Sequence, residues 1–88
     1  MRLDKFLKIS LIFKTRSSSD KYFEENKIFI NEKVVKPSTI VKIGDVLKII
    51  FPESIKTYKI IDIQEKNVSK KDAKNLYEQI KEEKIEIF

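Results

Sequence analysis

The chain has 88 residues, the length of one small domain, and it contains neither cysteine nor histidine. This composition excludes a disulfide framework and a thiolate zinc site, and it removes the commonest general base and the commonest metal ligand. Nineteen Lys or Arg residues against fourteen Asp or Glu residues give a net charge of +5, which indicates a polyanionic partner.

The excess positive charge lies entirely in the first half of the chain. Residues 1–48 contain eleven basic and six acidic residues, whereas residues 49–88 contain eight of each. The sequence has no apolar run near the roughly 20 residues of a membrane-spanning helix, and residues 9–13 are too few for the apolar core of a signal peptide. We therefore expect a cytoplasmic protein with a basic binding face in its N-terminal half.

An amphipathic helix is predicted at the N-terminus. Four residues follow the i, i+3, i+4, i+7 spacing of one helix face: Leu3, Phe6, Leu7 and Ser10. Three basic residues fall on the other side: Arg2, Lys5 and Lys8. Ile9 and Ile12 do not fit the apolar stripe, so this helix is expected to bend or end near them.

A second helix is predicted to begin at Ser17, an N-cap residue with the carboxylate of Asp20 three positions later, as in a weak capping box. Its shared face contains four residues: Ser19, Tyr22, Phe23 and Asn26. Asn26 can end the helix because asparagine tolerates the left-handed conformation that is needed there.

The middle of the chain predicts a small sheet. Residues 28–30 and 34–35 flank residues 31–33 as a tight hairpin, but Glu32 would resist a positive φ, which argues against a strict type I′ turn. Pro37 indicates a loop over residues 36–39, and Gly44-Asp45 marks a turn. Residues 46–51 and 57–64 are then expected to be strands on either side of the turn at residues 52–54.

The C-terminal part predicts a helix that covers one face of the sheet. Ser69 resembles an N-cap residue with Asp72 three positions later, and a helical stripe follows at Ala73, Leu76, Tyr77 and Ile80. Residues 85–88 alternate, as either a short strand or a frayed tail would. The expected fold is α+β: two N-terminal helices packed on a small, twisted, mainly antiparallel sheet, followed by a C-terminal helix.

The segment Arg2-Leu3-Asp4-Lys5-Phe6-Leu7-Lys8 resembles the RNA-binding domain named after the small-subunit ribosomal protein S-four. Four further pieces agree in order and spacing: Lys14-Thr15-Arg16-Ser17, Asn31, Lys36-Pro37-Ser38 and Gly44-Asp45. The resemblance implies an S-four-like RNA-binding domain over residues 1–66, with residues 67–88 as a helix and tail packed on the same domain.

The tail resembles one short branch of that family, the ribosome-associated quality-control P-site factors and the related fifteen-kilodalton heat-shock proteins. The matching pieces are Lys70-Lys71-Asp72-Ala73, Asn75-Leu76-Tyr77 and Glu82-Glu83-Lys84. This resemblance implies a non-catalytic adaptor without cofactor that binds large ribosomal subunits obstructed by peptidyl-tRNA. It would touch ribosomal RNA and the tRNA while a tail-elongating quality-control factor extends the stalled chain.

Four residues depart from the family pattern. The family often has basic residues where Leu11 and Thr15 stand, and glycine is usual at Asn26 and Glu32. The basic surface is therefore sparser than is typical, and Glu32 adds a repulsive carboxylate to the hairpin.

The positions expected to bind RNA follow from the basic N-terminal half and from the resemblance: Arg2, Lys5, Lys8, Lys14, Arg16, Ser17, Lys21, Lys33, Lys36 and Ser38. Lysines act as mobile charges for phosphates, while the planar fork of an arginine can bind one phosphate twice. The backbone N–H groups of a helix that starts at Ser17 would add a phosphate site. Any single lysine is more often a solvated residue, whereas both arginines of the chain lie in the matched segment.

Tyr22, Phe23 and Phe29 are better explained as core residues than as stacking platforms for bases, because they lie on apolar faces. Structured RNA, which is read by shape and by phosphate contacts, is therefore the favoured ligand.

Several other functions are weighed against RNA binding. Arg2-Leu3-Asp4 echoes a motif of pseudouridine synthases, but a catalytic Asp needs a larger domain, so Asp4 is expected to form a local ion pair. We expect neither a metal site nor a small-molecule substrate. Residues 2–13 resemble a membrane-surface helix, although the core needs their apolar side chains. A DNA-binding or protein-interaction module, and a general structured-RNA or tRNA binding module in ribosome assembly, stay open.

Overall fold

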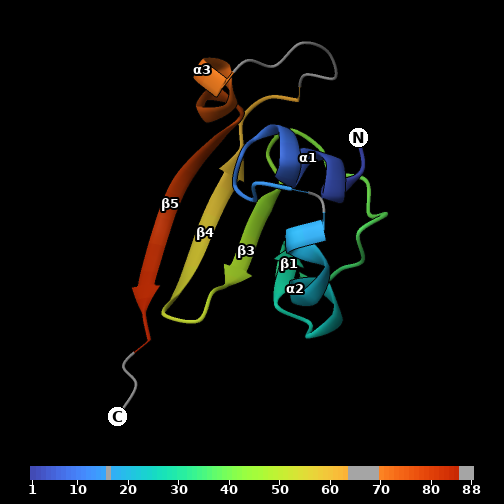
Figure 1. Cartoon of the computed structure of the whole chain (residues 1–88). Coiled ribbons are helices and arrows are strands. Elements are labelled where there is room, and N and C mark those ends of the chain that lie inside the picture. The colour runs from blue at the N-terminus through green and yellow to red at the C-terminus, as the bar shows by residue number, and fades with distance from the viewer. Residues whose placement is uncertain (16, 64–69, 86–88) are drawn as a thin grey trace.

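Two short helices lie against one face of an antiparallel sheet, as Figure 1 shows. The computed structural model describes residues 1–15, 17–63 and 70–85. In chain order, the elements are α1 (Leu3–Ile9), the 3₁₀ turn η1 (Ser17–Ser19), α2 (Asp20–Glu24), β1 (Ile28–Ile30), β2 (Lys33–Val34), β3 (Val46–Ile50), β4 (Ser54–Ile60), α3 (Lys70–Ala73), the 3₁₀ turn η2 (Lys74–Leu76) and β5 (Tyr77–Lys84).

The described strands form one five-stranded sheet in the order β2-β1-β3-β4-β5, and every neighbouring pair is antiparallel. The register places Leu47 opposite Tyr58, and both side chains point to the face that the helices cover. Side chains alternate between the two faces of a strand, so one face is buried and the other is open. The α+β class and the antiparallel sheet expected from the sequence are confirmed.

The N-terminal helix buries the stripe that its spacing predicts. Leu3, Phe6 and Leu7 are each 0% exposed, and Ser10, at 1%, donates its hydroxyl to the carbonyl of Leu7 at 3.3 Å. The helix ends at Ile9, and Leu11 then takes a left-handed φ of 59°. The prediction that the helix ends near Ile9 is confirmed.

The predicted start of the second helix is wrong. Ser17 begins the 3₁₀ turn η1, and α2 starts only at Asp20, with Ser19 at the N-cap position. The capping hydrogen bonds come from Thr15, whose Oγ1 accepts the N–H of Ser18 at 3.1 Å. The hydroxyl of Ser18 donates to the carbonyl of Thr15 at 2.7 Å. The capping residue is therefore Thr15, two positions before the predicted Ser17.

The turn between β1 and β2 also differs from its prediction. Ile30 pairs directly with Lys33, which leaves Asn31 and Glu32 as a two-residue loop with φ of 50° and 70°. Two positive φ values are the mark of a type I′ turn, so the argument against that turn is wrong. Asn26 directly follows Glu25, the C-cap residue of α2. It has φ 57°, the left-handed conformation that was predicted for it.

The predicted C-terminal helix is wrong beyond its first turns. The helical part ends at Leu76, and residues Tyr77–Lys84 form β5, which pairs with β4 along its whole length. The predicted stripe is divided between two structures. Ala73 and Leu76 lie in the short helical turns and are buried. Tyr77 and Ile80 lie on β5, where the ring centre of Tyr77 is 5.3 Å from that of Tyr58 and Ile80 is exposed at a register shift. Ser69, the expected N-cap residue, lies outside the described residues.

Phe29 is not a core residue, contrary to the prediction. It alternates with the buried Ile28 and Ile30 and therefore points to the open face of the sheet. There the Lys48 ammonium group lies 4.7 Å from the centre of its ring. Phe23 is buried, and Tyr22 packs against Phe13 and Phe51, so these two aromatic residues follow the prediction.

Candidate nucleic-acid interface

The loop after β2 is fastened to the first turn of α1 by main-chain hydrogen bonds. The N–H groups of Leu3 and Asp4 donate to the carbonyls of Thr39 at 2.7 Å and Pro37 at 3.1 Å. One step further, Val41 donates to the carbonyl of Met1 at 2.9 Å. These bonds satisfy N–H groups that have no partner inside a helix. They bring together two of the basic segments that the sequence indicated, one at residues 2–8 and one at residues 36–38.

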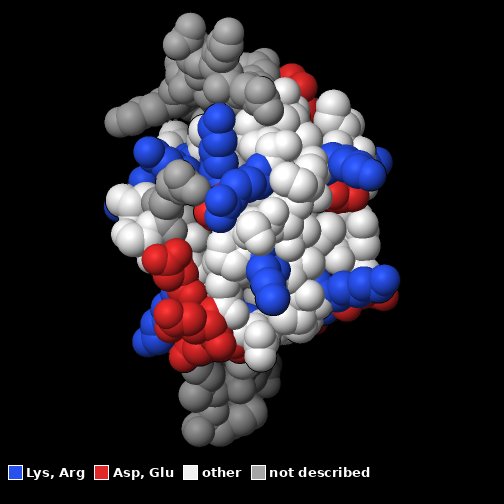
Figure 2. All heavy atoms as spheres, turned by 90° about the vertical axis from the view of Figure 1, so that its right-hand side faces the viewer, with Lys and Arg blue, Asp and Glu red and all other residues white. Residues whose placement is uncertain are grey.

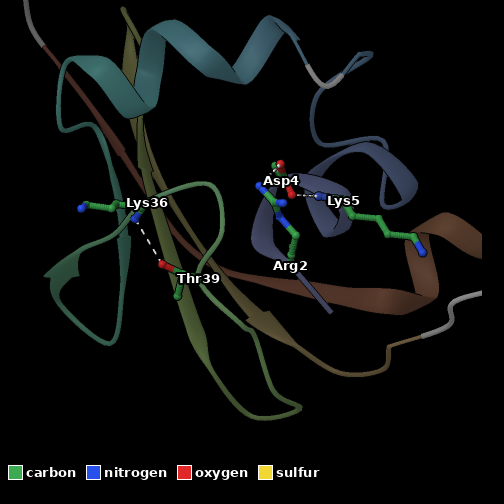
Figure 3. Close-up of polar contacts among 5 residues, drawn as sticks. All are labelled: Arg2, Asp4, Lys5, Lys36 and Thr39. Atoms are coloured by element: carbon green, nitrogen blue, oxygen red, sulfur yellow. Dashed lines mark hydrogen bonds and ion pairs between the residues drawn. The ribbon is translucent and has the colours of Figure 1, made fainter.

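Thr39 closes the loop upon itself, as Figure 3 shows. Its Oγ1 accepts the N–H of Lys36 at 3.1 Å, and its own N–H donates to the carbonyl of Lys36 at 3.0 Å. The loop predicted from Pro37 is confirmed, and Ser38 is exposed at its tip. Thr39 was missed by the sequence reasoning, although a threonine three residues after the start of a proline turn is a usual side-chain bridge.

Arg2 and Asp4 form an ion pair at the N-terminus of α1 (Figure 3). Nη2 of Arg2 donates to Oδ2 of Asp4 at 3.2 Å, while Oδ1 of Asp4 accepts the N–H of Lys5 at 2.8 Å. The arginine side chain is 53% exposed and the aspartate side chain only 10%. The local ion pair expected for Asp4 is confirmed, and the pair turns its cation toward solvent.

The basic side chains around this pair diverge. In Figure 3 the side chains of Lys5 and Lys36 point away from Arg2 in opposite directions. The positive charges are therefore spread along the surface and do not converge on one point. Such a spacing suits a series of phosphates on a folded RNA better than a single small anion.

The other predicted positions come from several elements. Lys14 lies in the turn after α1, Ser17 begins η1 and bonds to the hydroxyl of Thr15 at 3.2 Å, and Lys21 lies on α2. Lys33 lies on the edge strand β2, where it is exposed. Arg16 lies outside the described residues. Because Thr15 already accepts the N–H of Ser18, the phosphate site predicted from free N–H groups near Ser17 loses one of its donors.

The lysines of the predicted site differ in pairing from those of the second half. Within the described part of the chain, six of them form no ion pair: Lys5, Lys8, Lys14, Lys21, Lys33 and Lys36. By contrast, Lys81 binds Glu83 at 2.6 Å, which raises the pKa of the lysine and lowers that of the carboxyl. Lys56 lies 4.0 Å from Glu82. Lys59, Lys74 and Lys84 of the second half also form no ion pair, so within the described residues the predicted site is distinguished by having no paired lysine at all.

The face that contains the helices is not uniformly basic. Figure 2 shows separated groups of Lys and Arg side chains on it, with a compact group of acidic side chains toward one edge. A groove between α2 and the segment after β2 has Asp20, Glu24 and Asn26 on the α2 side and Lys36 and Pro37 on the other side, with apolar residues between them. Phosphates would avoid the two carboxylates on the α2 side of this groove, so the surface better suited to RNA is the part near α1, with residues 36–38 at its border with the groove.

Asn31 and Asp45, both within the resemblance, have structural roles. Oδ1 of Asn31 accepts the N–H of Val46 at 3.0 Å, and its amide donates to Asp45 at 3.2 Å. Asp45 also accepts the N–H of Lys42 at 2.8 Å. These bonds tie the β1–β2 turn to the Gly44-Asp45 turn, which was predicted and is confirmed by the φ of 94° at Gly44.

Two further features bear on the class of protein. Over residues 1–15, 17–63 and 70–85, no three acidic, histidine or cysteine side chains come together as a metal site requires. In the same ranges no helix is long and apolar enough to cross a membrane.

Comparison with known proteins identifies what this surface resembles. A model of the S4 domain family matches residues 1–47, the segment that contains α1, α2 and the loop at residues 36–41. The "RQC P-site tRNA stabilizing factor" of Halalkalibacterium halodurans is 44% identical over 85 residues, which span 97% of this chain and 96% of the relative. The protein of the same name in Bacillus subtilis is 36% identical over 97% of this chain and 98% of its own length.

A solved structure has the same fold. The heat shock protein 15 of Vibrio cholerae superposes with a TM-score of 0.81 at 31% identity, and the match covers 91% of this chain and 81% of the other. The sequence resemblance to the S-four-type domain and to this short branch of the family is therefore confirmed.

Proposed function

Because the chain belongs to the S4 domain family, and within it to the group of RQC P-site tRNA stabilizing factors, we propose that it is a non-catalytic RNA-binding factor of ribosome-associated quality control. It acts in the cytoplasm on large ribosomal subunits that are obstructed by peptidyl-tRNA. It contacts the ribosomal RNA and the tRNA together and holds the tRNA while a tail-elongating factor extends the stalled chain.

The observation that most supports this proposal is the set of exposed, unpaired lysines in the first half of the chain, of which Lys5 and Lys36 lie on either side of the Arg2–Asp4 pair (Figure 3). They come from α1, from the turn after it, from α2 and from the loop fastened to α1. Charges spread over separate elements can each neutralise a phosphate of a folded RNA, whose backbone passes the protein at several points. A rigid, compact RNA such as a tRNA on the ribosome presents phosphates in this way.

Crosslinking in cells followed by sequencing of the bound RNA tests the proposal. We expect crosslinks to large-subunit ribosomal RNA and to tRNA, enriched when translation is stalled. Crosslinks mainly to precursor ribosomal RNA would favour the alternative, a structured-RNA binding module in ribosome assembly. Recovery of DNA, or of no nucleic acid, would overturn RNA binding altogether.

Co-sedimentation with purified large ribosomal subunits tests whether peptidyl-tRNA is part of the binding site. Purified large subunits that contain peptidyl-tRNA should sediment with the protein, and empty large subunits should retain less of it. Equal retention by both would show that the tRNA is not part of the binding site.

A further inference from the structure

We propose that Asp4 is a positioning residue for RNA binding, because its shielded carboxylate holds the Arg2 guanidinium in the orientation in which it meets a phosphate. The inference rests on the proposed function and deepens it. It assigns a role in binding a polyanion to an acidic side chain, whose charge alone would oppose that binding.

The burial of the two side chains is the first observation. Asp4 is 10% exposed at its side chain, and Arg2 is 53% exposed. An approaching phosphate therefore meets the guanidinium, while the carboxylate lies behind it at 3.2 Å. A guanidinium has N–H donors on more than one edge, so Nη2 can stay on Asp4 while the remaining donors bind the phosphate.

The rigidity of the surroundings is the second observation. Arg2 lies at the N-cap position of α1 in extended conformation, with φ −71° and ψ 145°, and it bridges to Ile40. The other carboxylate oxygen of Asp4 accepts the N–H of Lys5 at 2.8 Å, which fixes its orientation relative to the helix. Both ends of the Arg2 side chain are thus restrained, at its backbone and at its guanidinium. A flexible arginine loses rotamer freedom when it binds, and this restraint removes part of that loss in advance.

The sign of the effect separates positioning from simple charge. A carboxylate near an RNA site repels phosphates, so removing a negative charge would by itself strengthen binding. If Asp4 positions Arg2, removing its charge must instead weaken binding, and only when Arg2 is present. The two accounts therefore predict changes in opposite directions.

A double-mutant cycle measures this coupling. The variants are Asp4→Asn, Arg2→Ala and the double variant, and the probe is an in vitro transcribed tRNA at fixed salt. Asparagine keeps the size of the side chain and an oxygen for the N–H of Lys5, so the helix start is preserved. We expect Asp4→Asn to weaken tRNA binding by about threefold to tenfold, in the lower part of the range for residues in contact. In the Arg2→Ala background the same change should leave binding unaltered or strengthen it.

Asp20→Asn is the matched control. Asp20 is the only other acidic residue before Tyr22 in the sequence, and it is exposed at the groove between α2 and the segment after β2. Its neutralisation removes the same charge without touching Arg2, so it should leave tRNA binding unaltered or strengthen it slightly. Melting temperatures of all variants are recorded in parallel, to show that each remains folded at the temperature of the assay.

Each outcome decides the matter. Stronger binding by Asp4→Asn in both backgrounds would show that Asp4 is only a repulsive charge. Equal weakening with and without Arg2, or no change in either background, would show that Asp4 does not act through Arg2, and each of these results overturns the inference. If the wild-type chain binds neither the tRNA in this assay nor large ribosomal subunits in the sedimentation experiment, the proposed function fails instead, and the two failures are thereby distinguished.

Discussion

Asn31 and Glu32 show how a local preference is overridden. Glutamate disfavours the left-handed region, yet Glu32 has φ 70°. The side chain of the preceding Asn31 bonds to Val46 and Asp45, and the pairing of Ile30 with Lys33 leaves room for only two turn residues. Together these contacts outweigh a backbone cost of about 1 kcal/mol.

Relief of that strain is the first prediction. Glu32→Gly should stabilise the protein by about 0.5–1 kcal/mol, because glycine adopts a positive φ freely. Thermal unfolding should show a melting temperature higher by roughly 3–6 °C for a domain of this size. Gly44→Ala is the opposite control: it has φ 94° and nothing within 4 Å of an added Cβ, so only the backbone resists, and stability should fall. A lower melting temperature for Glu32→Gly would contradict this explanation.

The second prediction concerns Tyr58 at alkaline pH. Burial, with the nearby Tyr77 and Glu82, raises the pKa of Tyr58 to about 12, above the value near 10 of an unfolded tyrosine. As pH rises between these values, the unfolded chain loses the proton first, so it binds fewer protons than the folded chain and stability falls. Tyr58→Phe should reduce this loss of stability, measured by urea unfolding from pH 9 to about 12.

The comparison between the variants isolates the phenol, because lysines that lose their charge in the same range are common to both. Tyr22→Phe, in the aromatic cluster with Phe13 and Phe51, is the matched control. An unchanged pH dependence in Tyr58→Phe would refute the assignment.

The third prediction compares two basic residues. Arg16, whose position is outside the described residues, lies in the segment that matches the S4 domain, while Lys81 is paired with Glu83 on β5. Arg16→Ala should weaken co-sedimentation with large ribosomal subunits by about tenfold to a hundredfold, the cost of a charge-assisted contact. Lys81→Ala should change it little, and both melting temperatures should stay close to that of the wild type. Equal binding by the two variants would show that the site lies elsewhere.

Among the elements, β5 marks the limit of prediction from sequence. Ala73, Leu76, Tyr77 and Ile80 have the i, i+3, i+4, i+7 spacing of a helix. Nothing in the sequence of residues 73–80 indicates that they pair with β4 as a strand. Once β4 is in place, cross-strand pairs such as Lys59 with Glu78 become possible and favour a strand. α1 and β1 were predictable because the buried residues of each follow the spacing of one helix face or one strand face.

The fourth prediction tests this arrangement. Leu76 is 0% exposed, and its carbonyl accepts the N–H groups of Ile61 at 2.9 Å and Asp62 at 3.2 Å. Leu76→Ala should cost about 2–5 kcal/mol of unfolding free energy, because it leaves a cavity. Ile80, 50% exposed at the register shift, should cost less than about 1 kcal/mol when changed to Ala. Similar costs in urea unfolding would instead favour a helix that buries both residues.

For the candidate site, the exposure of its described basic residues was predictable from the sequence, but their arrangement in space was not. The exposure of the basic residues follows from the amphipathic pattern of α1, and the Arg2–Asp4 pair follows from their nearness in sequence. The docking of residues 37–41 on α1 depends on main-chain hydrogen bonds between distant segments, which no side-chain pattern records. For the same reason Thr39 received no role from the sequence.

At the scale of the whole molecule, charge is separated along the chain. The described lysines of the first half are mostly unpaired, whereas Lys56 on β4 and Lys81 on β5 lie within 4.0 Å of Glu82 and Glu83. Residues 49–88 have no net charge, so attraction to a polyanion is directed to the N-terminal half of the chain.

The fifth prediction follows from this separation. If about three to five phosphates are neutralised, the logarithm of the tRNA binding constant should fall with the logarithm of salt concentration with a slope of roughly −2 to −5. Titrations from low to physiological salt give the slope directly. A slope near zero would mean that binding does not depend on the lysines, whatever its strength.

The docking of residues 37–41 on the first turn of α1 also sets an order of events during synthesis. Arg2, Lys5 and Lys8 are synthesised before Pro37 and Thr39, whose carbonyls accept the N–H groups of Asp4 and Leu3. Contacts between such distant segments close late in folding. A nascent chain therefore exposes these cations before the segment that holds them in place exists, and the proposed RNA-binding surface is complete only after residues 37–41 have docked on α1.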